Sequence, residues 1–170
     1  CWLMMFVSEP SSDLVTPTRL ESLNVRCCHL GSTACRVLAG WLITEAASNL
    51  HTLAIDENKF GGRGARALAL AIEQRGSGLP EGWFASTSTH DDDGTAQPFY
   101  FQRDIARNRT IGEAHWDLPE ASGSVVVTPL RELGISFCDF GDLALAAVLD
   151  ALATSETPPP ASLRIGGNHI

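Results

Sequence analysis

The residues of this chain best suited to metal binding are the consecutive His90, Asp91, Asp92 and Asp93. Imidazole and carboxylate groups are common metal ligands. Adjacent residues on one loop rarely converge on a single ion, however, and the sequence has no second cluster spaced to complete a site. We therefore expect a solvated acidic loop here and no metal site.

Two other short motifs could carry chemistry. Gly61, Gly62 and Gly64 precede a predicted helix, as in a phosphate-binding loop, but the Gly-Lys-Ser/Thr ending of such loops is absent. The glycosylation sequon that begins at Asn108 would matter only in a secreted protein. Serine and histidine residues are scattered and form no apparent nucleophile–base pair. We therefore predict that the protein is not an enzyme and uses no cofactor.

The remaining candidates are charged and aromatic residues at the predicted exposed positions of short apolar strands. Side chains on successive strands form rows about 4.8 Å apart, so together they predict a protein-binding face. Phe137 is the predicted energetic anchor, and the charges would set partner choice. In the competing interpretation Phe137 belongs to the core and the face is merely solvated. The predicted partner-binding residues are Arg26, Asp56, Glu57, Glu132, Phe137 and Arg164.

The element that must position these residues is a unit of strand, turn and helix, clearest at residues 50–72. With Leu50 as position 0, apolar residues fall at positions 3, 5 and 10, and Asn58 stands at position 8. Alternation through positions 2 to 6 predicts a strand with positions 3 and 5 buried. Apolar spacing from position 15 to 22 predicts one face of a helix. The same frame starts again at Leu20, Leu130 and Pro160.

Position 8 of the frame alternates between two residue types. It holds Cys28, Asn58, Cys138 and Asn168 in the four copies. A buried asparagine amide can satisfy backbone groups in the turn of the neighbouring unit, and cysteine can fill the same small space. Because one unit cannot bury its own apolar face, we expect the units to stack.

This pattern resembles the ribonuclease-inhibitor class of leucine-rich repeats, whose two repeat types alternate in this way. The resemblance covers residues 20–72 and 130–170 and includes Cys35 at position 15, where the next copy has Ala65. It implies an α/β solenoid, a horseshoe segment with parallel strands on its concave face and helices on its convex face. A repeat of this kind specifies a scaffold and does not by itself specify a function.

The repeats divide the chain into four predicted parts. Residues 1–19 form an irregular N-terminal lead-in, and residues 20–72 form two repeats. Residues 73–129 form an inserted, partly disordered loop, because they lack sustained apolar periodicity. Residues 130–170 contain one complete repeat and the strand of the next.

Three local expectations accompany this division. Within the insertion, residues 103–109 are predicted to form a short helix, and residues 125–127 to extend the following strand. The apolar run at residues 1–7 is predicted to be a strand or a helix end from a preceding unit. Since neither end carries a polar capping repeat, we expect the chain to be a segment of a longer solenoid.

Charge and cysteine content limit the possible functions. The formal net charge of −8 argues against a general nucleic-acid or membrane-surface binder. The five cysteines include three at repeat positions, which predicts reduced thiols in a cytoplasmic protein and no set of disulfides.

The function predicted from the sequence is therefore that of a non-catalytic protein–protein interaction scaffold using the concave face, with a partner of unknown identity. Two alternatives stay open. The repeats resemble those of Ran GTPase-activating proteins, which implies a regulator of a small GTPase, although no residue here identifies that role. They also resemble the ligand-sensing repeats of NLR-type receptors, an interpretation that requires a nucleotide-binding domain upstream.

Overall fold

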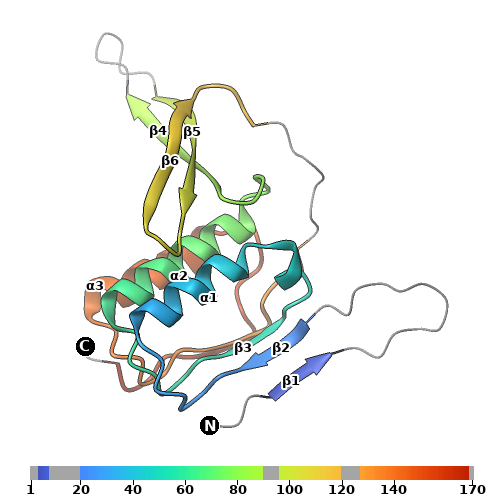
Figure 1. Ribbon diagram of the computed structural model, residues 1–170, viewed down its shortest axis with the longest axis vertical. Coiled ribbons are helices and arrows are strands. Elements are labelled where there is room, and N and C mark those ends of the chain that lie inside the picture. Colours follow the sequence, from blue (N-terminus) through green and yellow to red (C-terminus); the bar gives the residue numbers. More distant parts are fainter. Residues whose placement is uncertain (1–3, 8–19, 90–95, 120–126, 169–170) are drawn as a thin grey trace, which may run out of the picture.

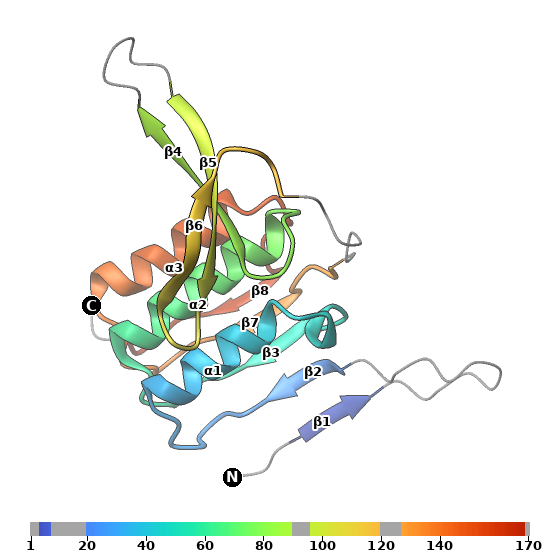
Figure 2. The ribbon, with the colours of Figure 1, turned by 45° about the horizontal axis from the view of Figure 1, so that its top comes forward.

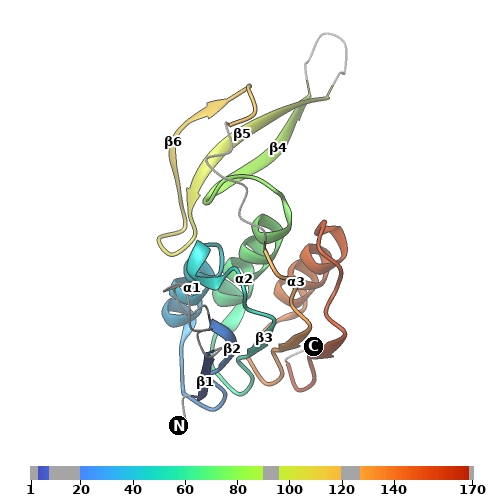
Figure 3. The same cartoon turned by 90° about the vertical axis from the view of Figure 1, so that its right-hand side faces the viewer.

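The computed structural model describes residues 4–7, 20–89, 96–119 and 127–168. These residues form three layers (Figures 1 and 3). A five-stranded sheet is covered on one face by helices α1, α2 and α3, and a separate three-stranded sheet stands on the other side of the helices. The strand order is β1-β2-β3-β7-β8 in the larger sheet and β4-β5-β6 in the smaller one.

The larger sheet contains one short strand from each copy of the repeat. These strands are β2 (Leu20–Asn24), β3 (Thr52–Ala54), β7 (Glu132–Gly134) and β8 (Ser162–Arg164). They run parallel, and their register places position 3 of every copy in one row, namely Leu23, Leu53, Leu133 and Leu163. Residues at the same position of the repeat frame are therefore paired with one another in the sheet.

Strand β1 (Met4–Val7) lies beside β2 but runs antiparallel to it (Figure 1). A strand that belonged to a preceding repeat would run parallel to the others. Residues 4–7 do form a strand, as predicted. The prediction that this strand belongs to a preceding repeat is wrong, because β1 runs in the opposite direction to the repeat strands. The rest of the predicted lead-in lies outside the described residues.

The helices cover the sheet face that carries positions 3 and 5. They are α1 (Ser32–Leu42), α2 (Gly61–Gly76) and α3 (Asp142–Thr154), and a short 3-10 helix, η1 (Glu45–Ala47), follows α1. Between the layers Leu53, Ile55 and Phe60 are fully buried, as are their counterparts in the next copy. Because each strand and helix buries only one side, the core forms between stacked copies.

In the second and fourth copies, the asparagine side chain at position 8 connects its own turn to the turn of the preceding copy by hydrogen bonds. The Asn58 side-chain oxygen accepts hydrogen bonds from the backbone N–H groups of Cys28 (3.1 Å) and Leu30 (3.0 Å), and its amide nitrogen donates to the carbonyls of Val25 and Ile55. Asn168 makes the equivalent four bonds to the third and fourth copies. The predicted role of this amide is confirmed.

Arg75, near the end of α2, joins several segments through its guanidinium group. It is 9% exposed and donates to the carbonyls of Leu42 (3.0 Å), Ala47 (2.8 Å), Leu50 (2.9 Å) and Thr128 (3.0 Å). Burial lowers the pKa of Arg75 to about 10, so the group keeps its charge at neutral pH. It therefore fixes the end of α1, the entry to β3 and the point where the chain returns from the insertion.

The insertion contains an ordered sheet, so its description as a loop is wrong. Strands β4 (Trp83–Thr89), β5 (Ala96–Asp104) and β6 (Arg109–His115) pair antiparallel. The short helix predicted over residues 103–109 is also wrong. Asp104 accepts a hydrogen bond from the backbone N–H of Arg107 (2.9 Å), and Asn108 has a positive φ of 53°, which favours a tight turn between strands over a helix.

The tip of this sheet rests on the helices (Figure 2). Ile105, in the β5–β6 turn, is 3% exposed and joins the core, and Arg36 of α1 donates from Nε to the carbonyl of Ala106 (2.7 Å). The acidic loop predicted at residues 90–93 and most of the strand extension predicted at residues 125–127 lie outside the described residues. Val127, which is described, precedes β7 without joining it.

Candidate protein-binding face

The face of the larger sheet opposite the helices, called here the open sheet face, displays positions 2, 4 and 6 of each repeat. Hydrogen bonds continue the parallel ladder beyond the strands themselves. Cys27 N–H donates to the Asp56 carbonyl (3.1 Å), Glu57 to Ser136 (2.8 Å) and Phe137 to Gly166 (2.9 Å). Residues at positions 6 and 7 of successive copies therefore lie side by side.

Position 7 adopts the left-handed backbone conformation in all four copies. The φ angles are 52° at Cys27, 60° at Glu57, 53° at Phe137 and 68° at Gly167. This region is uncommon for residues other than glycine, so the turn imposes it on three ordinary side chains. Of the four residues, only Gly167 is of a type that could have indicated this conformation from the sequence.

Asp56 is the centre of a charge network and not an exposed contact residue. Its side chain is 1% exposed and accepts a hydrogen bond from the Ser136 backbone N–H (3.0 Å). Arg26 (3.3 Å) and Arg164 (3.2 Å) pair with its other oxygen from either side. The prediction that Asp56 contacts a partner directly is therefore corrected, because its carboxylate is already enclosed by three donors.

Gly134 makes the Asp56–Arg164 pair possible. Gly134 stands at position 4 of β7, between the strand that precedes Asp56 and the strand that carries Arg164. A Cβ atom there would overlap both the Asp56 carboxylate and the Arg164 guanidinium. The absence of a side chain at this position lets a carboxylate and a guanidinium meet across an intervening strand, a contact between residues 108 apart in the sequence.

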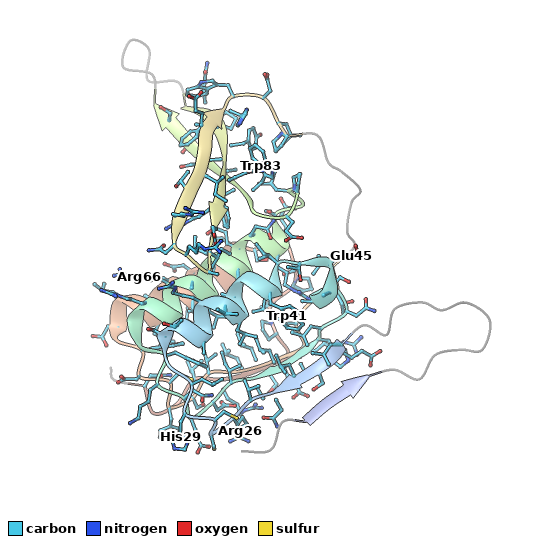
Figure 4. The ribbon with its side chains drawn as sticks, viewed as in Figure 1. Arg26, His29, Trp41, Glu45, Arg66 and Trp83 are labelled. Atoms are coloured by element: carbon cyan, nitrogen blue, oxygen red, sulfur yellow. The ribbon has the colours of Figure 1, made fainter. Side chains whose placement is uncertain are left out.

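At the edge of the network, Arg26 also pairs with Glu57 (3.1 Å), and both side chains are nearly half exposed. Figure 4 shows Arg26 where the strands enter the turns. The Cys27 thiol donates to the other Glu57 oxygen (3.0 Å), and this hydrogen bond, with smaller contributions from burial and from the Glu57 charge, raises the pKa of Cys27. The exposed Cys27 thiol therefore gives up its proton less readily than a free cysteine does.

Phe137 is 62% exposed, so the competing interpretation that it belongs to the core is wrong. Its ring lies over Gly167 of the next copy, where any Cβ atom would overlap it. Glu57 and Phe137 occupy the same position on neighbouring strands. The aromatic ring therefore stands next to the charged network on one surface.

Of the six predicted residues, the structure connects four directly, namely Arg26, Asp56, Glu57 and Arg164. Phe137 adjoins them through position 7. Glu132 is exposed but lies at position 2, at the other end of its strand, between Thr52 and Ser162, so it is separate from this cluster.

Comparison with known proteins agrees with the repeat frame. The family model described as "Leucine Rich repeat" matches residues 17–39 and 46–69, which overlap most of the first two strand–turn–helix units. Residues 17–39 and 46–69 are thus similar to leucine-rich repeats. No curated protein matches the chain. The third and fourth copies continue the register of the two matched repeats through β7 and β8.

Cysteines occupy the repeats in three different environments. Cys35 and Cys138 are buried free thiols, and burial raises their pKa values to about 12 and about 11 respectively. Cys27 is an exposed free thiol. Cys28, which is only partly buried at its turn, is disulfide-bonded, so the prediction that every cysteine is reduced is wrong at this position.

The described residues contain neither a metal-binding cluster nor a membrane-spanning helix. Within that part of the chain, histidine, cysteine, aspartate and glutamate side chains form no group of three that could hold a metal ion. In the same residues no helix has the length and apolar character needed to cross a membrane.

Proposed function

We propose that this protein is a non-catalytic interaction scaffold that binds another protein through the open sheet face. In this proposal the repeats are of the ribonuclease-inhibitor class and stack as a solenoid segment, so that the open sheet face is the concave one. Leucine-rich repeats commonly serve as protein-interaction modules. The observation that carries the proposal is the exposure of Phe137 beside the Arg26–Asp56–Arg164 network.

The aromatic and the charged residues of the open sheet face would have different roles in binding. Phe137 supplies apolar area that a partner can bury, as aromatic anchors do at many interfaces. Arg26, Glu57 and Arg164 keep exposed charge that would select a partner and steer its approach. Asp56 would act indirectly by fixing both guanidinium groups, which lowers the entropy lost when they bind.

Cytoplasmic location and the absence of a cofactor stay part of the proposal. So do the two alternatives, regulation of a small GTPase and ligand sensing in an NLR-type receptor. No feature of the described residues favours either alternative over a general interaction scaffold.

Affinity capture with variants would test this proposal. Immobilised wild-type chain should retain specific proteins from a cell extract, and Phe137→Ala should lose most of them. The matched control is Trp116→Ala, which removes an aromatic side chain of similar exposure (58%) from the bend after β6 of the inserted sheet. Partners that survive Phe137→Ala but are lost with Trp116→Ala would place the binding surface on the inserted sheet instead.

A further inference from the structure

A groove of about 870 Å³ lies on the helix side of the molecule, away from the open sheet face. Its walls come from α1, α2, α3 and the β5–β6 turn. It contains five of the chain's twelve basic residues, although the whole chain carries a formal net charge of −8. These five, which define the arginine groove, are Arg36, Arg63, Arg66, Arg103 and Arg107.

Not all of these arginines are occupied by contacts within the protein. Arg36 donates to the carbonyl of Ala106, and Arg107 pairs with Asp104 (2.9 Å). Arg103 bonds Asn108 through one terminal nitrogen (2.8 Å), while its buried Nε has no partner. Arg63 and Arg66 are exposed and, among the described residues, make no hydrogen bond or ion pair.

Arg63 and Arg66, the two arginines without such contacts, occupy positions at which a positive charge destabilises the helix. Arg63 lies in the first turn of α2, near the positive end of the helix dipole, and that turn contains no acidic residue. Arg66 follows three residues later, so the two like charges face each other on one side of the helix. A bound anion would relieve both repulsions further than the screening by water and dissolved ions does.

The arginine groove changes character along its length. The α2 residues that line the groove lie on one helix face, and they are Arg63, Arg66, Ala67, Ala69, Leu70 and Glu73. Ten residues of helix span about 15 Å. Between the arginines and Glu73, Ala67 and Leu70 form an apolar middle section of the groove, to which Ile105 and Ala147 add.

The repeat frame fixes the polarity of the groove. Arg36 and Arg66 both occupy position 16 of their copies, so they stand at the same level on neighbouring helices. Asp150 occupies position 20 and Glu73 position 23, which places both carboxylates toward the other end. A ligand that is anionic throughout would be repelled by this far end.

We propose that the arginine groove binds an acidic peptide segment of a protein partner, with its carboxylates at Arg63 and Arg66 and an apolar side chain over Leu70. Planar guanidinium groups pair with carboxylates through two parallel hydrogen bonds. A length of about 15 Å accommodates about four or five residues of extended peptide at roughly 3.3 Å each. This length and the apolar middle section favour a peptide over a small inorganic anion.

This surface is separate from the open sheet face, so the two proposals can fail independently. Three fluorescein-labelled hexapeptides test the groove by fluorescence anisotropy. The first, Asp-Glu-Asp-Leu-Leu-Ser, has the proposed order of charge and apolar side chains. The second, Lys-Arg-Lys-Leu-Leu-Ser, reverses the charge, and the third, Asp-Glu-Asp-Ser-Ser-Ser, removes the apolar part.

The first peptide should bind wild-type chain at least tenfold more tightly than the other two, and its affinity should fall as salt is raised. Arg63→Glu/Arg66→Glu should weaken it at least tenfold, and Arg63→Gln/Arg66→Gln should weaken it less. Arg131→Glu, an exposed arginine outside the groove, and Phe137→Ala should leave binding unchanged. Unchanged circular dichroism would show that the variants are folded, as expected for exposed side chains.

Two results would overturn the proposal. One is equal binding of the acidic and charge-reversed peptides, or equal binding by wild type and Arg63→Glu/Arg66→Glu. The other is complete displacement of the first peptide by an equal concentration of sodium phosphate, which would identify a site for a small anion instead.

Discussion

The stacked repeats and the inserted sheet are held in place by different kinds of contact. In the repeats, buried polar side chains such as Asn58 and Arg75 satisfy backbone groups of neighbouring units. The inserted sheet has no equivalent among the described residues, and β6 is exposed along its whole length. It docks through Ile105, Phe84 and the Arg36 bond to Ala106.

This difference shows why a chain can contain so long an insertion without losing its repeat. The insertion leaves after α2 and returns at Thr128, where the backbone N–H bonds the Ser48 carbonyl (2.7 Å) and Arg75 bonds the Thr128 carbonyl. Both ends are therefore fixed at one edge of the stack. The segment between these two ends can therefore fold independently of the repeats, provided that it packs against the helices at one place.

The most damaging single change should be Asn58→Leu in the repeat layer. It removes a buried amide that serves both its own turn and the preceding one, and it leaves several backbone groups unpaired. At about 1–3 kcal/mol for each unsatisfied group, with added strain from the branched side chain, we expect a loss of about 4 kcal/mol or failure to fold.

Chemical denaturation would measure this loss. The matched change is Cys138→Ala at the same position of the next copy, where mainly a small volume is lost, at about 1 kcal/mol. If the two variants had equal stability, position 8 would not distinguish the two repeat types as the hydrogen bonds indicate.

Arg75→Met should come next, at about 3 kcal/mol. Methionine keeps much of the apolar contact but removes the Arg75 donor from the carbonyls of Leu42 and Leu50, and leaves the Ala47 carbonyl with only the Leu50 N–H. Thermal unfolding would detect the change. Arg131→Met, at an exposed position, should alter stability by less than about 0.5 kcal/mol, and a similar loss there would remove the special role of Arg75.

Alkaline pH should weaken the repeats specifically, because Cys35 and Cys138 lie in them and the insertion contains no cysteine. Burial raises both folded-state pKa values, to about 12 and about 11, above the ordinary value of 9.0. The stability they confer is therefore complete below pH 9 and is lost as pH rises toward about 11 for Cys138 and about 12 for Cys35. Each thiol contributes a slope of about 1.4 kcal/mol per pH unit in that interval.

Unfolding free energies at pH 8 and pH 10 should accordingly differ by about 3 kcal/mol from these two thiols. The Cys35→Ala/Cys138→Ala variant, less stable at pH 8, should show a correspondingly smaller decrease. An identical decrease in both proteins would mean that other groups govern the alkaline loss.

The smallest global effect should come from Ile105→Ala at the tip of the inserted sheet. Loss of this anchor should let the sheet detach locally, with less than about 1 kcal/mol lost from the unfolding of the repeats. Amide hydrogen exchange should accelerate in β5 and β6 only. The control is Ile111→Ala, on the same sheet but 44% exposed. Faster exchange in β3 and β7 as well would show that sheet and repeats unfold as one unit.

Much of the repeat layer could be deduced from the sequence. The rows of Leu23, Leu53 and Leu133, the buried Phe60 and the bonds of Asn58 all follow from a frame of fixed positions. Such a frame is legible because alternation in strands and three- and four-residue steps in helices are local patterns, and repetition confirms them. The sequence left the exposure of Phe137 open between two interpretations, and the left-handed turn at position 7 decided it.

Other features depend on contacts that no local pattern encodes. The inserted strands have weak alternation, and their pairing is decided by turns such as that at Asp104 and by docking against the helices. The burial of Asp56 depends on Arg164, 108 residues away, and on the vacancy at Gly134 between them. The arginine groove likewise draws its residues from three helices and a turn, so only the tertiary structure could bring those charges together.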